Sequence, residues 1–222
     1  MELDRARGYV ALGLCVLALR ASAGDDGAFS KLLGDPVEQQ HVISGAKRAT
    51  VVLQNPCTEA QFSIENKFVP YKPLSFDSGG NIASGAWKQI VDEQGCGTRH
   101  VLNVMVSVHG AGDLAFVPLL PGTTHADPVL QKDAVKIVVQ ALSTVPGGRE
   151  ANCAIGYFAN TEFLQQEGVT LPGAKEPPWR ELWTLQSCTQ KMLVPVRSIP
   201  DPTGTSISVG PNADIRIVSL AY

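Results

Sequence analysis

Residues 100–142 read HVLNVMVSVHGAGDLAFVPLLPGTTHADPVLQKDAVKIVVQAL, and this stretch decides the fold. Branched apolar residues stand at every second position from Leu102 to Val108, which predicts a β-strand over 100–108 with one apolar face. His-Gly-Ala-Gly-Asp at 109–113 predicts a hairpin turn, and 114–120 returns as the partner strand. The stretch therefore begins with an antiparallel hairpin.

A helix follows this hairpin. Asp127 is a favourable N-cap residue, and Pro128 is favoured at the first position of a helix. Apolar residues then recur at helical spacing, with lysine and glutamine on the opposite face. We predict a helix over about 128–142 and an α+β fold of mostly antiparallel β-sheet with this one main helix.

The rest of the chain predicts further strands and one short helical turn. A β-branched run, Ala-Thr-Val-Val-Leu at 49–53, favours a strand within 42–54. Residues 161–167 favour a helical turn, and the proline-rich stretch 169–178 favours a surface loop. The other expected strands are 61–64, 152–159, 182–185, 191–199, 205–209 and 215–220.

Length and composition limit the class of protein. The chain has 222 residues, enough for one or two domains, and 44% of them are hydrophobic, which argues against wholesale disorder. Its formal net charge of −3 excludes a nucleic-acid surface driven by net charge, so no nucleic-acid partner is expected.

The N-terminus has the pattern of a secretory signal peptide over residues 1–23. Arg5 and Arg7 precede an apolar run over 9–19, and Ala-Ser-Ala at 21–23 is a typical cleavage site. The run is too short for a spanning helix, which needs about 20 residues. We expect export to the periplasm or secretion, with no membrane span after cleavage. An uncut N-terminal anchor is the alternative interpretation.

The tryptophans and cysteines predict an internal repeat. Trp87 lies nine residues before Cys96, and Trp179 lies nine residues before Cys188. An ungapped alignment in this register also pairs identical or similar residues on either side. We predict two repeated halves on this basis. Two unrelated hairpins with a shared tryptophan-to-cysteine spacing are the alternative.

The cysteine count predicts disulfides. Signal cleavage removes Cys15, and the even number that remains in an exported chain favours two bonds. Three pairings are open, and the repeat favours pairing within each half. The expected disulfides are Cys57–Cys96 and Cys153–Cys188. The expected domain organisation is a signal peptide at 1–23, an N-terminal segment at 24–41, a first α+β half at 42–148 and a second, β-rich half at 149–222.

The order of elements within 101–160 resembles a known family. Strand, glycine-containing turn, strand, Gly-Thr-Thr linker, Asp-Pro-x-Leu helix start and a further strand resemble the C-terminal domain of TonB-type energy transducers and the related TolA domain. The resemblance implies a periplasmic domain that binds a partner by adding a strand at a sheet edge. This chain departs from a transducer because it has no long proline-rich spacer.

Catalytic and metal-binding motifs are absent from the sequence. It contains no C-x-x-C, H-E-x-x-H, H-x-H or G-x-S-x-G pattern. No cofactor or metal is therefore expected. His125 with Asp127, and His109 in the hairpin turn, are the weak catalytic candidates. Glu162, Glu167 and Glu181 are expected to be solvated.

Three tryptophans have two interpretations. Trp87, Trp179 and Trp183 either pack over a disulfide or form an exposed aromatic platform for a peptide, sugar or lipid headgroup.

These features favour an exported binding protein without an evident catalytic site, with an envelope protein or a peptide as partner. A secreted hydrolase with a carboxylate or His–Asp site and a TonB-like envelope protein are the alternatives.

Overall fold

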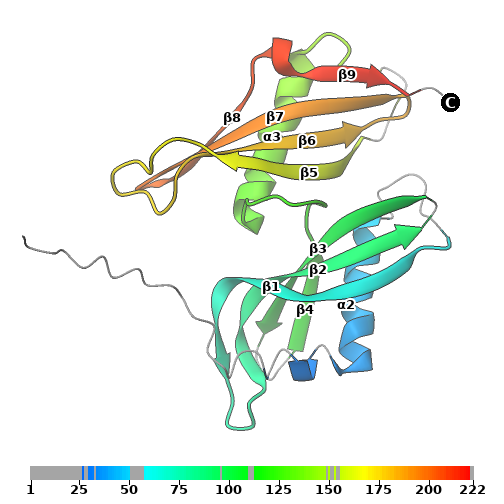
Figure 1. Cartoon of the computed structure of the whole chain (residues 1–222), viewed down its shortest axis with the longest axis vertical. Coiled ribbons are helices and arrows are strands. Elements are labelled where there is room, and N and C mark those ends of the chain that lie inside the picture. The colour runs from blue at the N-terminus through cyan, green and yellow to red at the C-terminus, as the bar shows by residue number, and fades with distance from the viewer. Residues whose placement is uncertain are drawn as a thin grey trace, which may run out of the picture.

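Two antiparallel sheets, each with one long helix, form the two halves of the molecule (Figure 1). The computed structural model describes residues 27, 30–32, 34–50, 58–95, 97–109, 113–148, 150, 153 and 156–220. The predicted signal peptide lies outside these residues. Within them, no helix is both long and apolar enough to cross a membrane.

The first half is a helix followed by a four-stranded meander in which each strand pairs with the next along the chain. Its elements are α2 (Pro36–Thr50), β1 (Gln61–Phe76), β2 (Ile82–Gly95), β3 (Thr98–His109) and β4 (Asp113–Pro118). The β3–β4 hairpin confirms the strand pair predicted over 100–120, with Val106 opposite Phe116. One face of this sheet packs against α2 in a core that includes Trp87, Val91 and Val104.

Helix α2 corrects the prediction of a strand over 42–54 as far as residue 50, and 51–54 lie outside the described residues. Val42 and Ala46, four residues apart, are buried on one helix face against the first sheet. Gly45 lies on the same face, where an added Cβ would come 3.1 Å from Val104 Cγ1. The Asp35 carboxylate accepts a hydrogen bond from the Val37 amide at 2.8 Å and caps the helix.

The second half repeats this order of elements. It contains α3 (Pro128–Thr144), β5 (Tyr157–Gln166), β6 (Trp179–Gln186), β7 (Gln190–Asp201), β8 (Gly204–Val209), the short 3-10 helix η1 (Asn212–Asp214) and β9 (Arg216–Ser219). The sheet order is β5-β6-β7-β8, and β9 also pairs with β7. Helix α3 is confirmed with its Asp127 cap. The helical turn expected at 161–167 is wrong, because residues 157–166 pair with β6 as a strand.

Each of the two sheets has its own hydrophobic core. Ala134, Val138 and Leu142 of α3 pack with residues of β6 and β7 such as Trp183 and Val194. Helix α3 therefore packs with the second sheet, and residues 119–127 connect the first sheet to it; the domain boundary expected at 148/149 stays a prediction. The elements that resemble the TonB/TolA domain are divided accordingly, with β3 and β4 in one sheet and β5 in the other. That resemblance stays a prediction.

The two halves share details of sequence and register. Trp87 pairs with Val106 and Trp179 pairs with Ser198, a separation of 19 residues in both hairpins. Asp-Pro-Val starts both helices, with Asp127 lying 92 residues after Asp35. Trp179 likewise lies 92 residues after Trp87. The same spacing therefore relates the two helices and the two central hairpins.

One of the two expected disulfides lies in the described part of the chain. Cys153 and Cys188 are bonded, with their Cα atoms 5.7 Å apart, as predicted. Cys57 and Cys96 lie outside the described residues.

Candidate functional site

The segment that connects the halves is hydrogen-bonded to both sheets. The Gly122 amide donates to Val101 O of β3 at 2.7 Å, and the Thr123 amide donates to Thr161 O of β5 at 2.6 Å. The buried Asn103 side chain donates to Leu120 O and Gly122 O, both at 2.8 Å. Backbone groups that lie between two sheets must find partners, and these bonds supply them. Residues 119–124 therefore hold the junction together.

Gly122 lies at the tightest point of this junction. Its φ is 97°, and a Cβ at this position would lie 2.0 Å from Thr161 O. Glycine meets both constraints because it has no side chain and adopts positive φ without strain. The close approach permits the parallel bridge between Gly122 and Thr161.

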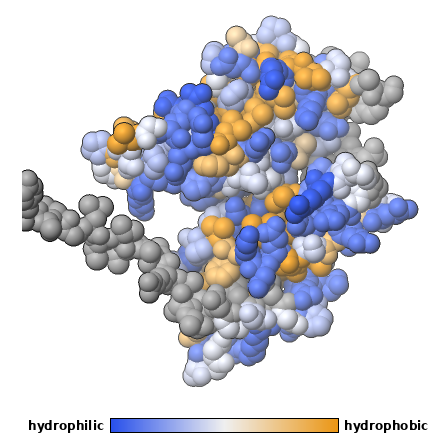
Figure 2. All heavy atoms as spheres, viewed as in Figure 1, coloured by the Kyte–Doolittle hydropathy of each residue, from blue (hydrophilic) through white to orange (hydrophobic). Residues whose placement is uncertain are grey.

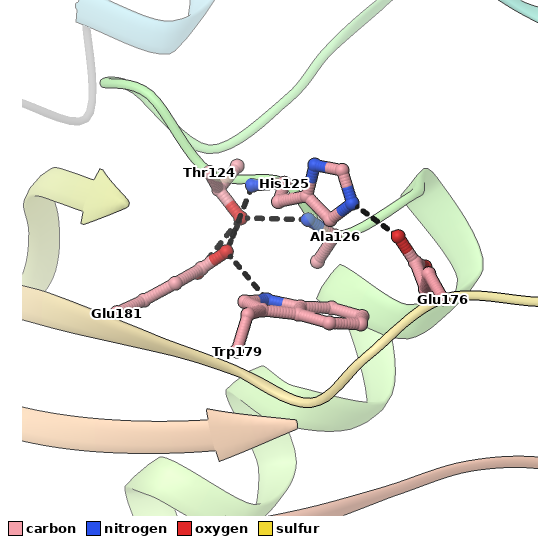
Figure 3. A network of polar contacts seen from close by, with 6 residues as sticks. All are labelled: Thr124, His125, Ala126, Glu176, Trp179 and Glu181. Atoms are coloured by element: carbon pink, nitrogen blue, oxygen red, sulfur yellow. Dashed lines mark hydrogen bonds and ion pairs between the residues drawn. The ribbon is translucent and has the colours of Figure 1, made fainter. Parts of the chain in front are cut away.

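A buried carboxylate organises the second half of the segment. Glu181 of β6 is 2% exposed, and its side chain points toward residues 124–126 (Figure 3). The hydrogen-bond donors to its two oxygens are Thr124 Oγ1, the His125 amide, Trp179 Nε1 and Trp183 Nε1, at 2.6 to 3.1 Å. A buried ion that is this fully bonded is tolerated in the interior.

The environment of Glu181 corrects one prediction. Glu181 was expected in solvent, yet it is buried beneath the connecting segment. Glu162 is exposed, as expected. Glu167 is paired with Arg180 and accepts from Arg197 Nε at 2.6 Å. Strand alternation explains Glu181, because Trp179, Glu181 and Trp183 project from the same face of β6.

His125 has a carboxylate partner, but the partner is not Asp127. Its Nε2 lies 2.6 Å from Glu176 Oε2, and its ring contacts Trp179 edge-on with centroids 4.9 Å apart (Figure 3). The Asp127 carboxylate instead accepts from the amides of Val129 and Leu130 as the cap of α3. The structure therefore places His125 beside Glu176 and uses Asp127 as the helix cap.

His109 lies elsewhere, at the end of β3. It pairs in register with Asp113, and its Nε2 lies 2.9 Å from Ser107 Oγ. Within the described part of the chain, no contact joins His109 to the His125 cluster. Turn chemistry accounts for its position, as it does for Asp113.

The tryptophans do not form an exposed platform. Trp87, Trp179 and Trp183 are only 1%, 2% and 1% exposed, respectively. Trp179 also does not cover the disulfide, because it begins β6 while Cys188 follows the end of that strand. Trp87 and Trp183 belong to the two cores, and Trp179 supports the His125 ring.

A groove of about 510 Å³ lies where the first sheet faces the connecting segment. Its lining residues are Val69 and Tyr71 of β1, Lys88 of β2, Phe163 of β5 and the connecting residues Thr123, Thr124 and His125. Both halves and the segment between them thus contribute side chains. Figure 2 shows a notch between the halves on the left of the view, with apolar residues above and below it.

Two titratable groups in the groove are shifted by burial. Burial lowers the pKa of Lys88, and the negative charge of Glu181 opposes this shift in part. Burial and, to a smaller extent, the charge of Asp127 raise the pKa of Tyr71 to about 12. The Tyr71 hydroxyl is buried without a hydrogen-bond partner among the described residues. Lys88 and Tyr71 are therefore partly desolvated where they border the groove.

Several of the groove residues belong to no sequence motif that predicts a binding site. Tyr71 and Lys88 lie on the paired strands β1 and β2 of the first sheet, and only the contact between the halves brings Phe163 of β5 to them. Glu181 did carry a signal, since Trp-Arg-Glu-Leu-Trp at 179–183 places a carboxylate between two tryptophans on one face of a strand.

No family model matches the chain, and neither the curated proteins nor the solved structures contain a match.

Proposed function

We propose that this is an exported binding protein, periplasmic or secreted, that holds a ligand in the groove between its two halves. The observation that carries the proposal is the convergence of β1, β2, β5 and the connecting segment on one partly apolar groove of about 510 Å³. Ligand sites commonly have volumes of about 300–1,000 Å³ and lie where domains meet. The Cys153–Cys188 disulfide supports export to an oxidising compartment, where such bonds form and persist.

The hydroxyl groups near the groove favour binding over catalysis. Thr124 Oγ1 donates to Glu181, and Thr123 Oγ1 accepts from the Phe163 amide at 3.0 Å. Both threonine hydroxyls thus maintain the junction, and among the described residues neither is bonded to the His125 ring. A hydroxyl nucleophile needs a general base within hydrogen-bond reach. The two threonines therefore favour a binding role for this part of the groove, and a secreted hydrolase with a carboxylate or His–Asp site stays the alternative proposal.

We also infer that the two halves are a repeat. The common order of helix and meander, the Asp-Pro-Val helix starts and the matching hairpin registers support this proposal. A repeat explains why the ligand groove lies between the halves, since the surfaces that meet there belong to different copies and are free to diverge.

Fragment binding to the full chain, exported by an expression host and then purified, tests the proposed function. We expect small aromatic and aliphatic fragments to shift the NMR signals of Val69, Lys88 and Phe163 together. Phe163→Ala should weaken this binding at least tenfold. Val139→Ala, on the exposed side of α3, is the matched control and should leave binding unchanged. Fragments that bind elsewhere and leave the groove signals unshifted would refute the proposal.

A further inference from the structure

Among the described residues, Lys88 is the only lysine, arginine, aspartate or glutamate that lines the groove, and the others supply aromatic rings, a valine and two threonines. It lies on β2 opposite Val69 of β1 and Met105 of β3, so it occupies the middle of the sheet face that borders the groove. A ligand that fills the groove must therefore either contact the Lys88 ammonium group or displace the water around it.

The Lys88 ammonium group makes few polar contacts with the described residues. Its Nζ donates to Thr124 O at 3.3 Å, and no carboxylate of the described residues lies within ion-pair distance of it. An ammonium group has three hydrogen-bond donors, and one is occupied here. A partly buried cation without an ion-pair partner gains more from an anionic ligand than an exposed one.

The neighbouring carboxylates are committed elsewhere. Glu181 accepts from four side-chain and backbone donors, Asp127 caps α3, and Glu176 pairs with His125. None of the three lines the groove. Glu181 lowers the positive potential at Lys88, and none of the three occupies the free donors of its ammonium group.

We propose, building on the function above, that the groove binds a small apolar carboxylate. The carboxylate group would accept hydrogen bonds from Lys88 Nζ. The aromatic or branched body would lie between Val69, which is 42% exposed, and the Phe163 ring. Desolvation of both sides of this contact favours an anion with an apolar body over a strongly hydrated one such as phosphate.

Three isosteric probes test the charge of the ligand on the exported, full chain. We expect 3-phenylpropionate to shift the groove signals and to bind at least tenfold more tightly than 3-phenylpropionamide or 3-phenylpropylamine. Lys88→Met should reduce binding of the carboxylate to the level of the amide, and Lys88→Arg should retain the preference. Lys191→Met, an exposed lysine on β7, is the matched control and should change nothing.

The outcomes separate this inference from the proposed function. If the amide or the amine binds in the groove as tightly as the carboxylate, or if Lys88→Met leaves the preference intact, the carboxylate inference is overturned while the groove remains a binding site. If none of the three probes shifts the groove signals but neutral fragments do, the carboxylate inference is likewise overturned and the groove remains a binding site. Groove signals that respond to no ligand at all would count against the proposed function itself.

Discussion

Trp183 Nε1 donates a hydrogen bond of 2.6 Å to Glu181 Oε2, two residues earlier on the same face of β6. The pair links the interior of the second half to its junction, because Trp183 packs in the core while Glu181 also holds Thr124 and His125 of the connecting segment. A single carboxylate thus couples the packing of one sheet to the position of the segment that lines the groove.

Replacement of Glu181 by alanine should destabilise the protein severely. The change leaves buried donors of Trp179, Trp183 and Thr124 without an acceptor, and each such group costs about 1–3 kcal/mol. We expect a loss of at least about 3 kcal/mol in the free energy of unfolding, measured by urea denaturation. Glu162→Ala, on the exposed side of β5, should change it by less than about 0.5 kcal/mol. Similar values for the two variants would contradict the role assigned to Glu181.

Gly122→Ala should also be destabilising, for a steric reason. The new Cβ would overlap Thr161 O, and the positive φ adds strain of about 1–2 kcal/mol. We expect a total loss of about 3 kcal/mol or more in thermal unfolding. Gly168 also has a positive φ, of 64°, but has open space around it, so Gly168→Ala isolates the strain. If both variants lose the same stability, the close approach at Gly122 is unimportant.

Lys88→Met should stabilise the protein at neutral pH. Because burial lowers the pKa of Lys88 from its ordinary 10.5, the folded state binds this proton less tightly than the unfolded state does. The wild-type protein therefore gains stability as pH rises toward 10.5, whereas the methionine variant does not. The stability difference between the two proteins, measured by urea denaturation, should be largest near pH 7 and shrink by pH 10. A difference that grows with pH would show that the lysine is not desolvated.

Tyr71→Phe should be neutral or stabilising by about 1 kcal/mol, because it removes a buried hydroxyl without a partner. The raised pKa of Tyr71, about 12, means that the folded state keeps this proton while the unfolded state loses it near pH 10. Stability of the wild-type protein should therefore fall between pH 10 and 12, and less so in the variant. Absorbance titration of the tyrosines that remain after signal cleavage should lose its latest phase in Tyr71→Phe. A late phase that persists would place the raised pKa on another tyrosine.

Local sequence patterns predicted the parts of the fold that depend on local chemistry. The Asp127-Pro128 cap located α3, and alternation over 100–120 located the β3–β4 hairpin. Helix α2 was missed although Asp35-Pro36 repeats the same cap, because the β-branched run at 49–53 was given more weight. Packing of Val42 and Ala46 against the first sheet favours the helix over 36–50.

The candidate site could not be predicted in the same way. Lys88 and Thr124 are separated by 36 residues, and Thr124 and Glu181 by 57, so only the folded arrangement of the halves brings them together. The pairing of His125 with Glu176 rather than Asp127 has the same origin, since Asp127 is used locally by the helix that it caps. The spacing of residues along the chain favours a pair between His125 and the nearby Asp127 carboxylate. In the folded protein, the loop before β6 brings the Glu176 carboxylate to His125 instead.

The hydrogen bonds of residues 119–124 have a consequence for how this molecule moves and evolves. The segment makes backbone hydrogen bonds to β3 on one side and to β5 on the other, so a hinge motion of the halves at this point would break backbone hydrogen bonds. We therefore expect a preformed groove that a ligand enters through side-chain motion alone. Exchange of one half for a homologous one would fail unless the connecting segment, with Gly122 and Thr124, were matched to both new neighbours.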